Sequence, residues 1–126
     1  MPITSRMNQS EQLTTFTATG EVTFNDIIEA LRPFFAGRAT KNILWNFCDA
    51  KPDVDDLTES LDRIAKFSNK ERKLRSSGKT ALVASADLMY GLLRMYETFA
   101  DIHGLAHSVM AFRTIEGALQ WINEDQ

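Results

Sequence analysis

Tyr90 and Arg94 are the residues in this chain best suited to bind a partner or ligand. They stand one helical turn apart in a predicted helix, where they present a phenol and a guanidinium on its polar side. The pair either contacts a ligand or second subunit, or Arg94 only forms a surface ion pair with Glu97. Gly91 lies beside them, and a mid-helix glycine costs about 1 kcal/mol relative to alanine. Either tight helix–sheet packing or the close approach of a partner or ligand would offset that cost.

Three carboxylates form a second candidate contact region. Asp49 follows a predicted strand, and Asp53 and Asp55 stand at the start of the next predicted helix. Acidic residues at this position cap a helix and complement its dipole. They also form a docking site for a partner in some proteins, so both interpretations stay open.

The other reactive residue types lack the neighbours that chemistry needs. Cys48 is the single cysteine, and a small buried hydrophobe is the better interpretation because no histidine is near it in sequence. His103 and His107 are four apart, but Gly104 should break the helix between them, which removes the spacing of a metal site. The glycines match neither a dinucleotide-binding nor a P-loop pattern. We predict no catalytic residue, no metal site, no cofactor and no enzymatic activity.

The composition favours one globular domain spanning residues 1–126. The net charge of −3 argues against nucleic acid as a partner, because phosphate binding needs clustered excess Lys and Arg. The basic run from Lys66 to Lys79 is typical of a solvated helix end. A single cysteine suits a reducing cytoplasm, and no apolar run is long enough to predict an integral membrane segment. We expect a cytoplasmic protein.

Strand and helix patterns alternate along the chain after an opening hairpin. Predicted strands cover residues 2–8, 13–19, 41–47, 80–85 and 106–112, and predicted helices lie between Thr23 and Gly37, over 55–76 and 87–102, and after Thr114. Gly20 is predicted to end the second strand, and residues 48–53 are predicted to form a polar loop. This order predicts an α/β fold, with a mixed, mainly parallel sheet of four to five strands, an antiparallel N-terminal hairpin and about four helices.

The helix predicted over residues 87–102 has an unusually wide apolar arc. One apolar seam consists of Leu88, Leu92, Met95, Phe99 and Ile102, and a second consists of Met89, Leu93, Tyr96 and Ala100. A single core contact seldom needs both seams. The helix therefore either lies under a neighbouring helix as well as on the sheet, or forms a homodimer.

Four local patterns together resemble a known family. They are Gly20-Glu-Val-Thr-Phe before the first helix, Asn42-Ile-Leu-Trp-Asn-Phe with Asp49 ending a strand, Asp87-Leu-Met-Tyr-Gly-Leu-Leu-Arg-Met-Tyr-Glu97, and Phe112 followed by Ala118-Leu-Gln-Trp-Ile122. In this order they resemble the bacterial SpoIIAA-like group of STAS domains (sulfate transporter and anti-sigma-factor antagonist), which is similar in fold to the CRAL-TRIO lipid-transfer domains. The resemblance implies a mostly non-enzymatic domain that binds protein partners and, in some members, nucleotides or small apolar ligands.

The chain departs from that family at one functional position. The resemblance implies a phosphorylated serine at the start of the helix after the third strand, but this chain reads Lys51-Pro-Asp-Val-Asp-Asp56 there. No Ser or Thr occurs in this stretch before Thr58, so the sequence does not support a phosphorylation switch. The acidic stretch either resembles a permanently phosphorylated loop or is a solvated loop and helix cap.

The prediction is therefore a non-catalytic STAS-like protein-interaction or regulatory module, with a protein partner of unknown identity and a possible homodimer. The alternative is a carrier or sensor of a small apolar or lipid-like ligand. An internal apolar cavity of about 300 Å³ or more would favour that alternative. The side chains that either line such a pocket or form ordinary core are Phe34, Phe35, Trp45, Met89, Leu93, Met95, Tyr96 and Met110.

Overall fold

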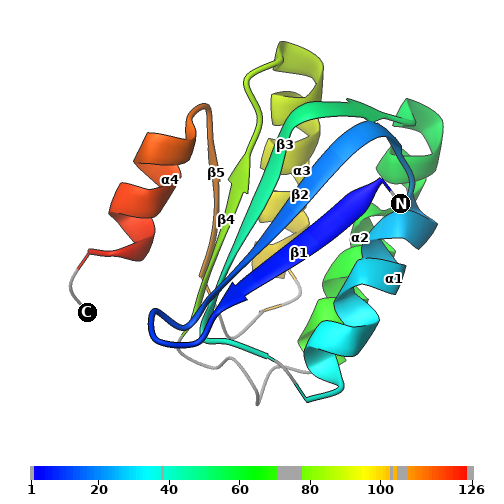
Figure 1. Ribbon diagram of the computed structural model, residues 1–126. Coiled ribbons are helices and arrows are strands. Elements are labelled where there is room, and N and C mark those ends of the chain that lie inside the picture. Colours follow the sequence, from blue (N-terminus) through cyan, green and yellow to red (C-terminus); the bar gives the residue numbers. More distant parts are fainter. Residues whose placement is uncertain (1, 38, 71–77, 103, 105–107, 125–126) are drawn as a thin grey trace.

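The computed structural model describes residues 2–37, 39–70, 78–102, 104 and 108–124 (Figure 1). Strands and helices follow the predicted order. The strands are β1 (Ile3–Asn8), β2 (Leu13–Val22), β3 (Asn42–Pro52), β4 (Lys79–Val83) and β5 (Ser108–Phe112), and the helices are α1 (Phe24–Phe35), α2 (Val54–Lys70), α3 (Asp87–Ile102) and α4 (Ile115–Ile122). Residues 71–76 of the predicted second helix and 106–107 of the predicted last strand lie outside the described residues.

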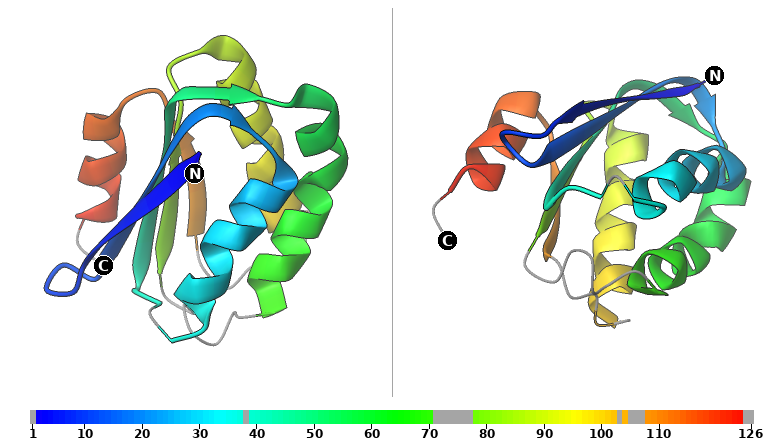
Figure 2. Two further views of the ribbon diagram at one scale, coloured as in Figure 1. Left: turned by 45° about the vertical axis from the view of Figure 1, so that its right-hand side comes forward. Right: turned by 60° about the horizontal axis from the view of Figure 1, so that its bottom comes forward.

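The five strands form one mixed sheet in the order β1-β2-β3-β4-β5. β1 runs antiparallel to β2, and the remaining neighbours are parallel, which confirms the predicted fold class. Helices α1, α2 and α3 lie on one face of the sheet and α4 on the other, as the two views of Figure 2 show. β4 is covered on both faces, and its continuous apolar run reflects that position.

β2 and β3 are longer than predicted. β2 continues through Gly20, which has φ +71°, and β3 continues through the segment predicted as a polar loop. The two extensions pair with each other from Thr19 opposite Asp49 to Val22 opposite Pro52, after a register shift in β2. Gly20 therefore bends the strand instead of ending it, since glycine adopts positive φ without steric cost. Asp49 lies within a strand, not at its end.

Helix α1 begins and ends at features visible in the sequence. The Thr23 hydroxyl accepts a hydrogen bond from the Asp26 N–H, and the Asp26 carboxylate accepts one from the Thr23 N–H, which is the predicted capping box. The helix stops two residues after Pro33. Phe34 is buried, whereas Phe35 is half-buried.

The larger hydrophobic core fills the space between the sheet and helices α1 to α3. The Phe16 and Trp45 rings stack at its centre, with 4.3 Å between centroids, and Phe47 continues the stack. A smaller core lies under α4 and includes Leu44, Val83, Ala118 and Ile122, with Cys48 partly buried against it. Helix α2 packs on both α1 and α3, on the same face of the sheet.

Candidate functional site

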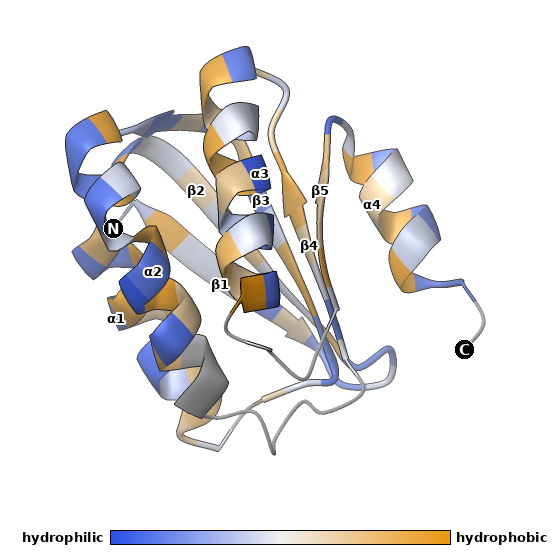
Figure 3. Ribbon diagram, turned by 180° about the vertical axis from the view of Figure 1, so that it is seen from behind, coloured by the Kyte–Doolittle hydropathy of each residue, from blue (hydrophilic) through white to orange (hydrophobic). Residues whose placement is uncertain are grey.

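The two apolar seams of α3 have different surroundings. The second seam is buried in the larger core, together with Leu92 of the first seam. By contrast, Leu88 is 57% exposed and Met95 is 40% exposed. In Figure 3, α3 lies between α2 and the end of the sheet that carries β5. The neighbouring helix therefore accounts for part of the wide arc, and an exposed apolar edge remains.

Gly91 lies in the middle of this exposed side of α3. A Cβ atom built on Gly91 would have no atom of a described residue within 4 Å, apart from its chain neighbours and the backbone of its own helix. The interpretation of Gly91 as a tight helix–sheet contact is therefore wrong, because its Cα faces open space. We call the exposed residues Asp87, Leu88, Gly91, Arg94 and Met95 the outer face of α3.

The polar edge of the outer face belongs to a network that reaches beyond α3. Arg113, just after β5, places its guanidinium 4.2 Å from the centre of the Tyr90 ring. Its Nη1 atom also donates to Asp87 Oδ1 at 2.8 Å and to the Ser85 carbonyl at 3.0 Å. Sequence reasoning missed Arg113, because only the parallel pairing of β4 and β5 brings it beside the start of α3.

Arg94 lies on the same edge, in contact with Tyr90 and Glu97. Its Nη1 atom donates to the Tyr90 hydroxyl at 3.5 Å, and its Nε lies 3.4 Å from a Glu97 oxygen. The Tyr90 hydrogen bond, followed by the Glu97 charge, raises the pKa of Arg94. The other Glu97 oxygen accepts a hydrogen bond from the Ala111 N–H on strand β5. Arg94 is thus a permanent cation that also remains exposed to a partner.

The predicted acidic region has mainly structural contacts. Asp53 caps α2, since its Oδ1 accepts from the Asp56 N–H at 3.2 Å. Asp56 in turn accepts the Phe24 N–H of α1 at 2.6 Å, so it joins the starts of two helices. Asp55 on α2 and Asp49 on β3 are exposed. Asp56 was not among the predicted site residues, and its link to Phe24 spans 32 positions in the sequence.

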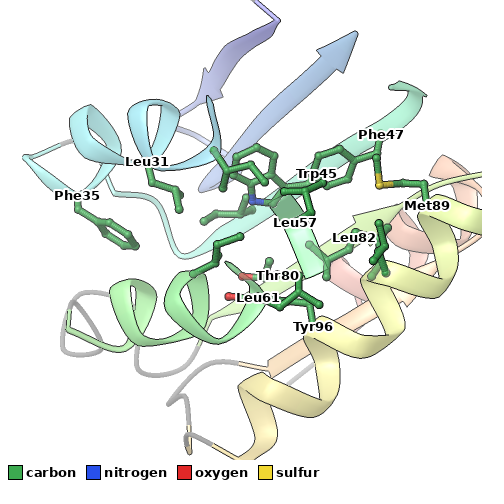
Figure 4. Close-up of a pocket in the computed structure, with 15 residues that line it drawn as sticks. Leu31, Phe35, Trp45, Phe47, Leu57, Leu61, Thr80, Leu82, Met89 and Tyr96 are labelled. Atoms are coloured by element: carbon green, nitrogen blue, oxygen red, sulfur yellow. The ribbon is translucent and has the colours of Figure 1, made fainter. Parts of the chain in front are cut away.

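An apolar cavity of about 70 Å³ lies between the sheet and the three helices on that face (Figure 4). Protein interiors seldom contain voids larger than one water molecule, which needs about 10–15 Å³. The lining residues are Ile27, Leu31, Phe35, Ile43, Trp45, Phe47, Leu57, Leu61, Ile64, Thr80, Leu82, Met89, Leu92, Leu93 and Tyr96.

Five of the eight predicted pocket residues line this cavity, namely Phe35, Trp45, Met89, Leu93 and Tyr96. The other three do not. Phe34 packs edge-on against Phe16, whereas Met95 and Met110 are exposed. Their apolar character alone did not show which of them face the cavity.

Other kinds of site find no support within the described residues. No three His, Cys, Asp or Glu side chains there gather as a metal site would require. None of the described helices has both the length and the apolar character to cross a membrane. His103, His107, Arg72, Lys73 and Arg75 lie outside the described residues.

Comparison with solved structures identifies the fold. A DUF3478-family protein with a SpoIIAA-like fold from Shewanella loihica PV-4 superposes with a TM-score of 0.58 and 19% identity, covering 95% of this chain and 91% of that one. The unphosphorylated anti-sigma factor antagonist SpoIIAA superposes with a TM-score of 0.53 and 15% identity, covering 98% and 99%. No family model and no curated protein matches the sequence.

These neighbours show that the chain has the SpoIIAA-like fold of STAS domains, as its local patterns predicted. At such low identity the likeness extends to the fold alone. Functions are not inherited with a fold, so a function must be argued from the residues of this chain.

Proposed function

We propose that this chain is a non-catalytic, STAS-like interaction module that self-associates through the outer face of α3. The observation that carries the proposal is the exposed Gly91 between an apolar edge and a charged edge of one helix. Because no contact among the described residues requires glycine there, we infer that it allows a close helix–helix crossing. The regulatory role of the anti-sigma factor antagonist, a neighbour in fold, supports an interaction function.

The outer face is self-complementary if two α3 helices cross antiparallel at Gly91. Residues seven apart on a helix differ by only about 20° in direction. Leu88 and Met95 therefore share one edge, and Asp87 and Arg94 share the other. A two-fold axis perpendicular to both helices keeps like edges together. A parallel pairing would instead place the charged edge against the apolar edge.

The spacing along the helix also matches in the antiparallel arrangement. With a rise of about 1.5 Å per residue, Asp87 lies about 6 Å before Gly91 and Arg94 about 4.5 Å after it. Arg94 of each copy then comes beside Asp87 of the other, and Leu88 comes beside Met95. Asp87 already contacts Arg113 through Oδ1, and its side chain is 94% exposed, which leaves Oδ2 for a second cation.

We expect this association to be weak and sensitive to salt. One pair of crossing helices buries less surface than the roughly 1,600 Å² of a standard interface. A Kd between about 10 µM and 1 mM corresponds to roughly 4–7 kcal/mol, a range that suits a small patch. The exposed ion pairs add about 0.2–1 kcal/mol each and are screened by salt.

Charge reversal tests the proposal. Asp87→Arg alone or Arg94→Asp alone should weaken self-association about tenfold, since two symmetry-related attractive pairs become repulsive. The double variant should recover most of the loss because the pairs are restored in reverse. Asp101→Arg, an exposed residue on the same helix away from the crossing, is the matched control.

Sedimentation velocity across a concentration series that reaches the millimolar range measures each variant. Circular dichroism checks that each one is folded. Single variants that associate as the wild type does, or a double variant as weak as the singles, would contradict the antiparallel pairing. A wild-type protein that stays monomeric throughout would reject self-association, and would leave a different protein as the occupant of the outer face.

A further inference from the structure

We propose that the apolar cavity under α2 is a binding site for a compact, uncharged, mainly apolar molecule of about the size of a single aromatic ring. Its floor is formed by side chains of β3 and β4, and its walls by α1, α2 and α3 (Figure 4). This site is separate from the outer face of α3, so it does not depend on the proposed self-association.

The lining determines the chemical class of the ligand. None of the lining residues carries a charge, and burial of an unpaired charge in such a space is strongly unfavourable. Thirteen of the 15 lining residues are hydrophobic or aromatic without a hydroxyl group. Ordered water needs two to four polar partners, so most of this volume is unsuited to water and suited to hydrocarbon.

Two hydroxyl groups provide the polar part of the site. The oxygens of Thr80 on β4 and Tyr96 on α3 lie on the same side of the cavity in Figure 4. A hydroxyl both donates and accepts hydrogen bonds, and its proton rotates to suit a new partner. A ligand with one hydroxyl group on its ring can therefore form hydrogen bonds with the hydroxyl groups of Thr80 and Tyr96. Two or more polar groups on the ligand would face apolar side chains and be left unpaired.

The size of the cavity excludes larger ligands. Drug-sized or lipid-like molecules occupy pockets of about 300–1,000 Å³. This cavity has about 70 Å³, so a long acyl chain does not fit. The lipid-like part of the ligand prediction is therefore set aside, and the small apolar part is retained.

Phe35 marks the route of entry. It is half-buried, whereas the other lining residues are buried. Its ring lies 5.8 Å from that of Phe67 on α2, across the contact between α1 and α2. Phe35 is the last residue of α1, two positions after Pro33. Fewer backbone hydrogen bonds hold the helix at this end. Rotation of this side chain would open the cavity without moving the sheet.

Intrinsic fluorescence provides a direct test. Trp45 lines the cavity and Trp121 lies on α4, so Trp121→Phe leaves Trp45 as a single reporter inside the site. Benzene and phenol should shift or quench its emission in a saturable manner and raise the melting temperature. Benzoate, which has the same ring with a negative charge, should do neither.

Cavity-filling variants identify the site. Leu61→Phe should weaken binding of benzene and phenol at least tenfold, because the added ring atoms enter the cavity. Leu119→Phe makes the same change in the smaller core under α4 and should leave binding unchanged. Phe35→Ala should speed binding and release while preserving saturation. Absence of a saturable response to benzene and phenol in the wild type would overturn the proposal, as would equal binding of benzoate. If Leu61→Phe does not fold, the comparison of the three ring compounds decides alone.

Discussion

Asp87 and Arg94 lie two helical turns apart on the same edge of α3, both exposed, with Gly91 between them on the outer face. Each already has a partner of opposite charge within its own chain, Arg113 for Asp87 and Glu97 for Arg94. Asp87 and Arg94 therefore lie about 10.5 Å apart along the helix axis. In the proposed antiparallel pairing, Asp87 of each copy would lie beside Arg94 of the other.

Gly91→Ala should change stability and association in opposite directions. Alanine is the better helix former, and nothing in the chain contacts the new methyl group, so unfolding of the monomer should cost up to about 1 kcal/mol more. The same methyl group would separate two helices that cross at this position. We expect weaker self-association by sedimentation and greater stability in urea at low concentration.

Gly117→Ala is the comparison variant for Gly91→Ala. Its Cβ would lie 3.2 Å from Thr114 Oγ1, the cap of α4, so the gain in helix propensity should be offset and association unaffected. An unchanged association constant for Gly91→Ala would show that the helices do not cross at this residue.

Asp56→Ala should destabilise the fold. The substitution removes the acceptor of the Phe24 N–H at the start of α1, which we expect to cost about 1 kcal/mol. Asp55→Ala, the exposed neighbour, should have an effect near zero on unfolding in urea. Equal stability of the two variants would mean that the contact between Asp56 and the Phe24 N–H does not stabilise the fold.

Glu97→Ala should remove a hydrogen bond to the edge strand β5. Glu97 accepts the Ala111 N–H of β5, the last strand in the sheet order, so its loss leaves an unpaired donor on an edge strand. We expect a loss of about 0.5–1.5 kcal/mol in the free energy of unfolding and faster aggregation by light scattering. Asp101→Ala, also on α3 and exposed, should change neither quantity.

Thr40→Val tests a buried polar contact. The Thr40 hydroxyl donates to the Asn42 carbonyl at 2.8 Å and lies 2.9 Å from the buried Thr14 hydroxyl. Valine fills the same space but leaves both groups without this partner, at an expected cost of about 1–3 kcal/mol. The double variant with Thr14→Val should recover part of the loss. Thr4→Val on the exposed side of β1 should have little effect on thermal unfolding.

Prediction from sequence succeeded where local signals agree with the fold. The predicted bounds of α3 match the structure because the helical pattern of apolar residues stops before Gly104. Thr23 and Thr114 cap the helices that were predicted to begin after them. It was wrong about residues 48–52, where polar side chains alternate with buried Ala50. A strand at that position depends on pairing with the β2 extension, and pairing partners are not encoded locally.

The candidate site was only partly predictable for the same reason. Tyr90, Gly91 and Arg94 could be grouped as candidates because their spacing on one helix is visible in the sequence. Arg113 and Asp56 were missed, since each acts on a residue more than 20 positions away. Which residues of the two seams stay exposed also could not be read from the pattern, because both seams are apolar.

The sequence by itself determined the order of the elements, the mainly parallel α/β class and the helix caps, because these follow from hydrophobic period, chain direction and short-range hydrogen bonds. Only the tertiary structure decided that Gly91 faces open space and that α2 spans a cavity above Trp45. Those properties depend on how far apart packed elements stand, a distance set by side chains from five elements together. No local pattern contains that distance.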